Sequence, residues 1–132
     1  MTLNSDQPLV AAALTTAAGS VSPDFTWASA AASQDGAFLA YVADGPAPAQ
    51  HLANTSAADA VLTLTPDGGT GTDVAVPAGQ SVVIGVAAST AYLVTGGTGI
   101  AAAVGYTGDG LASSYTLSPI GPLAEAIPVY SH

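Results

Sequence analysis

The feature that most constrains the fold is a regular alternation, from Ala37 onward, between short apolar runs and clusters of Gly, Pro, Asp and Asn. Runs of four to eight apolar or β-branched residues bounded by such clusters are typical of β-strands joined by turns. The pattern predicts strands over residues 38–43, 50–53, 60–65, 73–76, 81–86, 91–95, 100–107 and 114–117.

The patterning within these runs indicates how a sheet would lie. In residues 60–65, Leu62 and Leu64 alternate with Val61 and two threonines, so the leucines share one face of a strand. No long amphipathic helix interrupts the strands, which argues against a βαβ architecture. Turn signals at a spacing of about 8–12 residues favour a β-sandwich or a small barrel. We therefore expect an all-β domain, a β-sandwich or jelly-roll-like fold.

The predicted connections follow from turn chemistry. Residues 66–69 (Pro-Asp-Gly-Gly) and 77–80 (Pro-Ala-Gly-Gln) contain the proline and glycine that tight turns favour. The run Gly-Gly-Thr-Gly at residues 96–99 is interpreted as a tight hairpin between two strands. Four Asp-Gly pairs begin at residues 35, 44, 67 and 109, and they too are interpreted as turns.

Both ends of the chain differ from this middle part. We expect an N-terminal arm over residues 1–28, a β-sandwich over 29–117 and an extended C-terminal tail over 118–132. The arm is predicted to hold an edge strand around residues 9–16 followed by a loop, with a short helix over 10–18 as the alternative. The tail carries three prolines, which lack the N–H that the interior of a sheet requires.

The charge balance limits the partners. The chain has 132 residues with no Lys or Arg and 9 acidic residues. Nothing can neutralise phosphates, so nucleic acid and anionic membrane surfaces are not expected partners. Halophilic adaptation could also deplete lysine, but such proteins carry many more acidic residues. A partner is expected to be neutral or basic where it meets the carboxylates.

Two aromatic residues stand out in the arm. Phe25 and Trp27 are two positions apart, so they point to the same side of an extended chain. They either plug one end of the core or anchor the arm on a partner, since buried aromatics dominate interface energetics. Asp24 adjoins this pair. The candidate docking residues are Asp6, Asp24, Phe25, Trp27 and Glu125.

Catalytic machinery is not apparent. The only imidazoles are His51 and the terminal His132, and there is no cysteine, so neither an activated nucleophile nor a zinc site can be assembled. Asp67 and Asp73 flank a glycine-rich turn and could contribute to calcium binding, although turn chemistry explains the Asp-Gly pair there. We expect no enzyme, no cofactor and no metal.

Three segments resemble a known family: His51-Leu52-Ala53-Asn54-Thr55-Ser56, Ala60-Val61-Leu62-Thr63-Leu64-Thr65, and the Val-Pro-Ala-Gly turn at 76–79 leading into the strand from Ser81. They resemble the small β-sandwich decoration (cement) proteins and head-accessory domains of tailed bacteriophages, over residues 37–117. The resemblance implies a structural virion protein on the outer capsid surface, bound to the major capsid protein and often trimeric.

These observations predict a homotrimeric capsid decoration protein that stabilises the shell by bridging capsid subunits. The small Ala and Val side chains make a thin core, and oligomerisation is a common remedy for a marginal core. The alternative is an adhesive or glycan-binding module of a phage fibre or cell surface. Exposed aromatics clustered at loop tips would favour that alternative.

Overall fold

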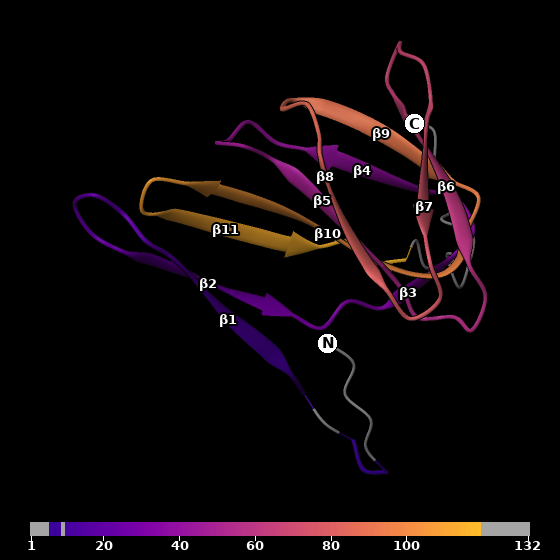
Figure 1. Cartoon of the computed structure of the whole chain (residues 1–132), viewed down its shortest axis with the longest axis horizontal. Coiled ribbons are helices and arrows are strands. Elements are labelled where there is room, and N and C mark those ends of the chain that lie inside the picture. The colour runs from indigo at the N-terminus through magenta and orange to yellow at the C-terminus, as the bar shows by residue number, and fades with distance from the viewer. Residues whose placement is uncertain (1–5, 9, 120–132) are drawn as a thin grey trace, which may run out of the picture.

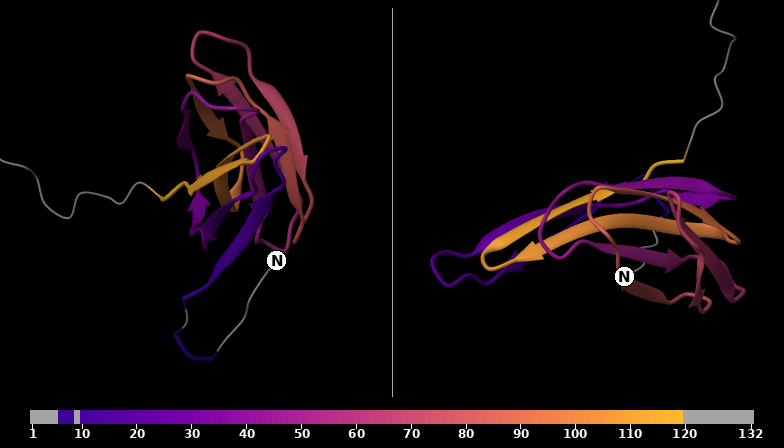
Figure 2. Two further views of the ribbon diagram at one scale, coloured as in Figure 1. Left: turned by 90° about the vertical axis from the view of Figure 1, so that its left-hand side faces the viewer. Right: turned by 90° about the horizontal axis from the view of Figure 1, so that it is seen from above.

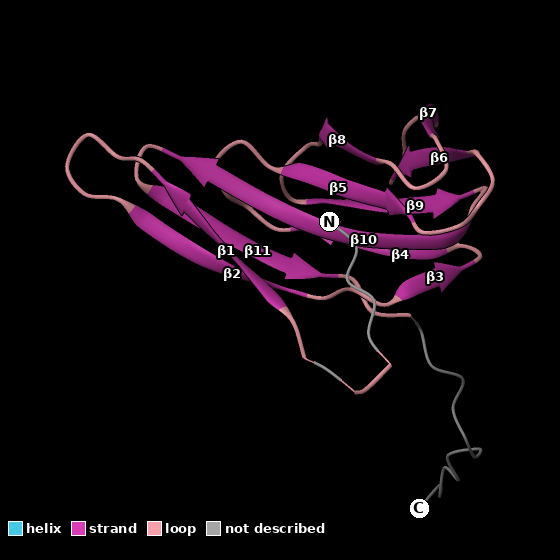
Figure 3. Cartoon of the chain, turned by 60° about the horizontal axis from the view of Figure 1, so that its bottom comes forward, coloured by secondary structure: helices cyan, strands magenta, loops and turns pink. Residues whose placement is uncertain are grey.

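The protein is an all-β sandwich with a β-hairpin projecting from one side (Figure 1). The computed structural model describes residues 6–8 and 10–119, and within them every regular element is a strand. All strand pairs are antiparallel. Figure 3 shows the strands joined by loops and turns, without a helix. The predicted all-β fold class is therefore confirmed.

The larger sheet has five strands. Its order is β11-β10-β5-β8, and β3 pairs with the start of β10 on the edge that β11 occupies further along. Its members are β3 (Ser33–Asp35), β5 (Ala49–Asn54), β8 (Ser81–Gly85), β10 (Thr98–Gly108) and β11 (Leu111–Thr116).

The smaller sheet has four strands in the order β4-β9-β6-β7. They are β4 (Phe38–Val42), β6 (Ala60–Pro66), β7 (Thr72–Val76) and β9 (Thr90–Thr95). All eight strands predicted from the sequence are present in the two sheets, each within a few residues of its expected bounds. Within these two sheets, only β3, three polar or charged residues long, was not predicted.

The core lies between the two sheets and is built by the alternation that predicted the strands. In β6, Leu62 and Leu64 are buried in the core, whereas Val61 points to the opposite face and is exposed to solvent. The buried hydrophobic side chains are mostly Val, Leu, Ile and Ala, and they include two tyrosines, Tyr92 and Tyr106. The core thus combines small side chains with leucine, isoleucine, phenylalanine and tyrosine, where the composition had led us to expect mainly Ala and Val.

Successive strands mostly lie in opposite sheets. Only β6–β7 and β10–β11 are hairpins within a sheet, while the other connections from β4 onward cross between sheets. The prediction of a hairpin at 96–99 is wrong, because β9 pairs with β4 and β6 whereas β10 pairs with β3, β5 and β11. These glycines carry the chain across the sandwich, with Gly96 and Gly99 at positive φ.

Two other predicted turns are confirmed. At 66–69 the Gly69 N–H donates to Pro66 O at 2.9 Å and Gly68 has φ 67°, closing the β6–β7 hairpin. At 77–80 the Gln80 N–H donates to Pro77 O at 3.0 Å, which turns the chain from β7 toward β8.

The N-terminal region is a hairpin of β1 (Ala12–Ala17) and β2 (Asp24–Ser29). The predicted edge strand is confirmed near its expected place, and the alternative helix over 10–18 is wrong. The loop expected after the strand ends at residue 23, because residues 24–29 form β2. β2 runs across the boundary that the sequence placed between residues 28 and 29. Figure 2 shows this hairpin and the β10–β11 hairpin reaching out of the sandwich on the same side.

The C-terminal tail lies largely outside the described residues. Its beginning is fixed, since the Leu117 N–H donates to Ala102 O at 2.9 Å and the Leu117 side chain packs against the core. The prediction of an extended tail over 118–132 concerns mostly residues beyond this part. No helix in the described ranges is long and apolar enough to cross a membrane.

Candidate docking surface on the projecting hairpin

The tip of the β1–β2 hairpin is fastened to the tip of the β10–β11 hairpin. Asp109, in the β10–β11 turn, accepts hydrogen bonds from the Ser20 N–H at 2.6 Å and from the Ser20 hydroxyl. The Gly110 N–H donates to Ala18 O at 3.1 Å. A Cβ on Gly19 would lie 2.5 Å from the Gly110 Cα, so only glycine permits this approach.

The Asp109 carboxylate is held ionised by this contact. The Ser20 hydroxyl, followed by the Ser20 N–H, lowers the pKa of Asp109 from its ordinary value of 3.8. Sequence reasoning assigned Asp109 to turn chemistry alone. Its role in joining two hairpins 89 positions apart could not be read from the sequence.

A second carboxylate, that of Asp24, holds the start of β2 against β11. Asp24 accepts hydrogen bonds from the Ala112 N–H of β11 at 3.0 Å and from the Phe25 N–H at 2.8 Å. These two donors, Ala112 first, lower the pKa of Asp24 from 3.8. Further along the strand, the Thr26 and Ser114 hydroxyls lie 3.4 Å apart. The polar side of the hairpin therefore faces β11.

The opposite side of the hairpin is apolar and exposed. In the β1–β2 register Leu14 lies directly opposite Trp27, and Phe25 is two residues before Trp27, so the three side chains share a face. Leu14 is 51% exposed, Phe25 59% and Trp27 60%. We call Leu14, Phe25 and Trp27 the hairpin face. Its exposure overturns the alternative that Phe25 and Trp27 plug the end of the core.

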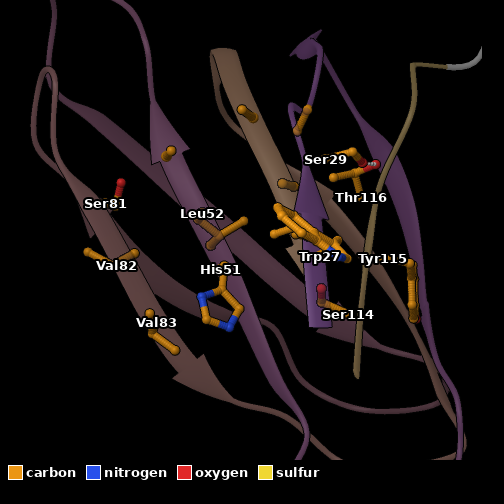
Figure 4. Close-up of a pocket in the computed structure, with 16 residues that line it drawn as sticks. Trp27, Ser29, His51, Leu52, Ser81, Val82, Val83, Ser114, Tyr115 and Thr116 are labelled. Carbon is orange, nitrogen blue, oxygen red and sulfur yellow. Dashed lines mark hydrogen bonds between the residues drawn. The ribbon is translucent and has the colours of Figure 1, made fainter. Parts of the chain in front are cut away.

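A shallow groove adjoins the hairpin face on the outer side of the five-stranded sheet. Its first part, of about 220 Å³, runs from Trp27 to His51 and Val83 (Figure 4). Its second part, of about 280 Å³, continues past Gly105 beneath β2. The floor consists of small residues on β10, because Ala101, Ala103 and Gly105 alternate along the outward side of that strand. Among the described residues, no carboxylate lines either part.

His51 is the one ionisable imidazole of the groove. It is exposed on β5 and packs beside Gly105, where an added Cβ would lie 2.9 Å from His51 Nε2. None of the described residues gathers three or more His, Asp or Glu side chains into a group that could hold a metal ion. The groove can accept an apolar or hydroxyl-bearing surface, and its lining offers no acid–base pair.

The structure brings three of the five predicted docking residues together. The first four residues of β2 include Asp24, Phe25 and Trp27. The two aromatic side chains are exposed, and the Asp24 carboxylate accepts a hydrogen bond from β11. Asp6 is exposed, and Glu125 lies outside the described residues. Leu14 was missed, because its membership of the face depends on the pairing of β1 with β2.

Comparisons of the chain with models of protein families, with curated proteins and with solved structures found no match.

Proposed function

We propose that this chain is a structural assembly protein that docks onto a larger protein surface through the hairpin face. In the form that the sequence resemblance suggests, it decorates the outer surface of a tailed-phage capsid and bridges major capsid protein subunits. The observation that carries the proposal is the exposure of Leu14, Phe25 and Trp27 side by side on a hairpin that projects from the sandwich (Figure 1).

The energetics support a docking role for this face. Aromatic side chains bury about 150–250 Å² each and supply most of the binding energy in many interfaces. The chain has only 1 Trp and 2 Phe. Phe38 is in the core, yet Trp27 and Phe25 are both left outside it. A sandwich with a thin core would gain stability by burying them, so their exposure favours a use outside the chain.

The carboxylates support a neutral or weakly basic partner surface. Besides Asp24 and Asp109, Asp35 accepts the Gly99 N–H at 3.1 Å and Asp59 accepts the Ala78 N–H at 2.9 Å. These groups stabilise the chain's own turns. These carboxylates lie in turns or at the ends of short strands, while the hairpin face itself carries none.

The position of the aromatics also weighs against the glycan-binding alternative. That alternative expects exposed aromatic rings at loop tips. Here the exposed rings of Phe25, Trp27, Tyr41 and Tyr115 all belong to strands. A flat strand face suits a protein surface better than a single sugar ring.

The test is co-sedimentation of the purified chain with empty shells of the phage that encodes it. The wild type is expected to saturate the shell, and Phe25→Ala or Trp27→Ala should weaken binding by about tenfold or more, as for interface hot spots. Leu39→Ala is the matched control, because Leu39 is 63% exposed but lies on β4 in the other sheet. Absence of shell binding, or equal losses in all three variants, would contradict the proposal.

A further inference from the structure

The outer edge of β1 is an unpaired strand edge. The β1–β2 hairpin is a sheet of two strands, and among the described residues β1 pairs only with β2. Residues 12–16 are exposed throughout. An isolated two-stranded hairpin is marginally stable in water, whereas sheets of more strands are stable. The edge is thus open to a partner strand, which would extend this small sheet.

The backbone groups that face this edge follow from the register. The Ala30 N–H donates to Ala11 O at 3.2 Å, so residues 11 and 30 form a hydrogen-bonded pair. Hydrogen-bonded and non-hydrogen-bonded pairs alternate in an antiparallel ladder. Residues 13 and 15 therefore bond to β2, and the N–H and C=O groups of Ala12, Leu14 and Thr16 point to the free edge.

The described strand β1 carries neither the charges nor the prolines nor the bulges by which proteins often prevent strand addition. Natural edges are commonly protected by charged side chains, prolines, bulges or a covering loop. β1 has the sequence Ala-Ala-Leu-Thr-Thr-Ala, with no charge and no proline, and its pairing with β2 runs without a register shift. This edge is therefore suited to adding a strand.

We propose that β1 pairs antiparallel with β1 of a second copy of this chain, about a two-fold axis at Leu14. With the groups of residues 12, 14 and 16 facing outward, the symmetric register places Leu14 opposite Leu14 of the second copy and Ala12 opposite its Thr16. Both are hydrogen-bonded pairs. The product is a four-stranded sheet in the order β2-β1-β1-β2, and the contact is closed because each copy uses the same edge.

The pairing joins the two hairpin faces into one surface. Trp27 lies opposite Leu14 within each copy, so a continuous row runs Trp27, Leu14, then Leu14 and Trp27 of the second copy. A surface of this width suits a docking role better than one hairpin does, although the pairing does not depend on that role.

Charge favours this occupant. Each chain carries a net charge of −9 and no Lys or Arg, so two copies repel each other wherever the touching surfaces carry carboxylates. β1 has none, and the one carboxylate in β2, Asp24, lies at the end of the ladder opposite Ala17 and is bonded to Ala112. The β1 edge thus lets two acidic chains meet without opposing charges.

The first test is the oligomeric state of the full chain by sedimentation velocity at micromolar concentration. The wild type is expected to be a dimer. Thr16→Pro removes an N–H that faces the free edge and not β2, and by symmetry it acts twice, so the dimer should weaken at least tenfold. Thr16→Val keeps the N–H and should remain dimeric. Unchanged Trp27 fluorescence and circular dichroism would verify that the hairpin of the proline variant is intact.

A second test does not depend on that variant folding. The chain has no cysteine, so Leu14→Cys introduces a single thiol, which a short bis-maleimide should cross-link into dimers. Val61→Cys, exposed on the other sheet, should not cross-link. A wild-type monomer or trimer, or a dimer that Thr16→Pro leaves unchanged, would overturn the pairing. Shell binding by a monomer would leave the proposed function standing while refuting this inference.

Discussion

The sandwich and the β1–β2 hairpin use the same kind of strand in opposite ways. In the sandwich, alternation places one set of side chains between two sheets, so Leu62, Val94 and Ile100 are buried almost completely. In β2 the alternation is as regular, but among the described residues no second sheet covers the apolar side of the hairpin. Leu14, Phe25 and Trp27 are each more than half exposed.

The two parts are held in place by different kinds of interaction. Burial of apolar area stabilises the sandwich, at roughly 25 cal/mol per Å². The hairpin is attached mainly by polar contacts: Asp109 to Ser20, Asp24 to Ala112, and hydroxyl pairs along β2. Solvent-exposed hydrogen bonds of this kind contribute little each, so the hairpin is the part that can come away first.

The largest effect is expected from matched truncations in the two regions. Leu62→Ala removes a side chain that is 1% exposed and should lower the free energy of unfolding of the sandwich by about 2–5 kcal/mol. Leu14→Ala should leave that free energy within about 0.5 kcal/mol, as surface substitutions usually do. Urea denaturation followed by circular dichroism measures both. Equal losses would show that the hairpin belongs to the cooperative core.

The same contrast explains what the sequence could predict. The spacing of Leu62 and Leu64 predicts a half-buried strand, and every strand of the sandwich with such spacing was predicted. The alternation in Asp24–Ser29 was present too, but Pro23 and the surrounding Ser and Thr suggested a loop. β3 offered no pattern, because its three residues include no apolar side chain.

Pairing between distant strands was the part that could not be predicted. The glycines at 96–99 show that the chain bends, but not whether the next strand joins the same sheet. That choice depends on contacts with β3 and β5, far away in the sequence. The candidate site shows the same limit: Phe25 and Trp27 were found by type and spacing, whereas Leu14 required the register of two strands.

A second, smaller effect is expected from two buried amides on β5. Neither polar atom of the Gln50 side chain has a hydrogen-bond partner among the described residues, although the side chain is fully buried. A buried unsatisfied polar group costs about 1–3 kcal/mol. Gln50→Leu, at a site between Val104 and Ile84, should therefore raise the free energy of unfolding by about 1–2 kcal/mol.

Asn54 is the matched control at the other end of the strand. Its amide donates to Val76 O at 2.9 Å and to Ala58 O at 2.7 Å, and it accepts the Ser56 N–H at 2.9 Å. Asn54→Leu removes these three hydrogen bonds and should destabilise the sandwich. If both substitutions changed the stability in the same direction, hydrogen-bond satisfaction would not be what distinguishes the two sites. Either change should leave the hairpin attached.

The smallest effect concerns acid, and it acts on the hairpin alone. The pKa values of Asp24 and Asp109 are lowered from 3.8 by the hydrogen bonds that fasten the hairpin. Because the pKa values are lowered in the attached state, the two carboxylates stabilise attachment at pH values above their ordinary pKa of 3.8. This contribution is lost as the pH falls through the lowered pKa values. The hairpin should therefore detach below about pH 3.8, before the sandwich unfolds.

Trp27 makes this detachment measurable, because it is the only tryptophan and lies on β2. Its emission should shift to longer wavelength between pH 4 and pH 2 as the indole leaves the groove rim, while the far-ultraviolet circular dichroism of the sandwich changes little. Asp24→Asn combined with Asp109→Asn should abolish the acid transition, since neither side chain then titrates. Asp67→Asn, in the β6–β7 turn, should leave it intact. If fluorescence and circular dichroism instead changed together in the wild type, the hairpin and the sandwich would form one cooperative unit, and the distinction between a core held by burial and a hairpin held by polar contacts would fail.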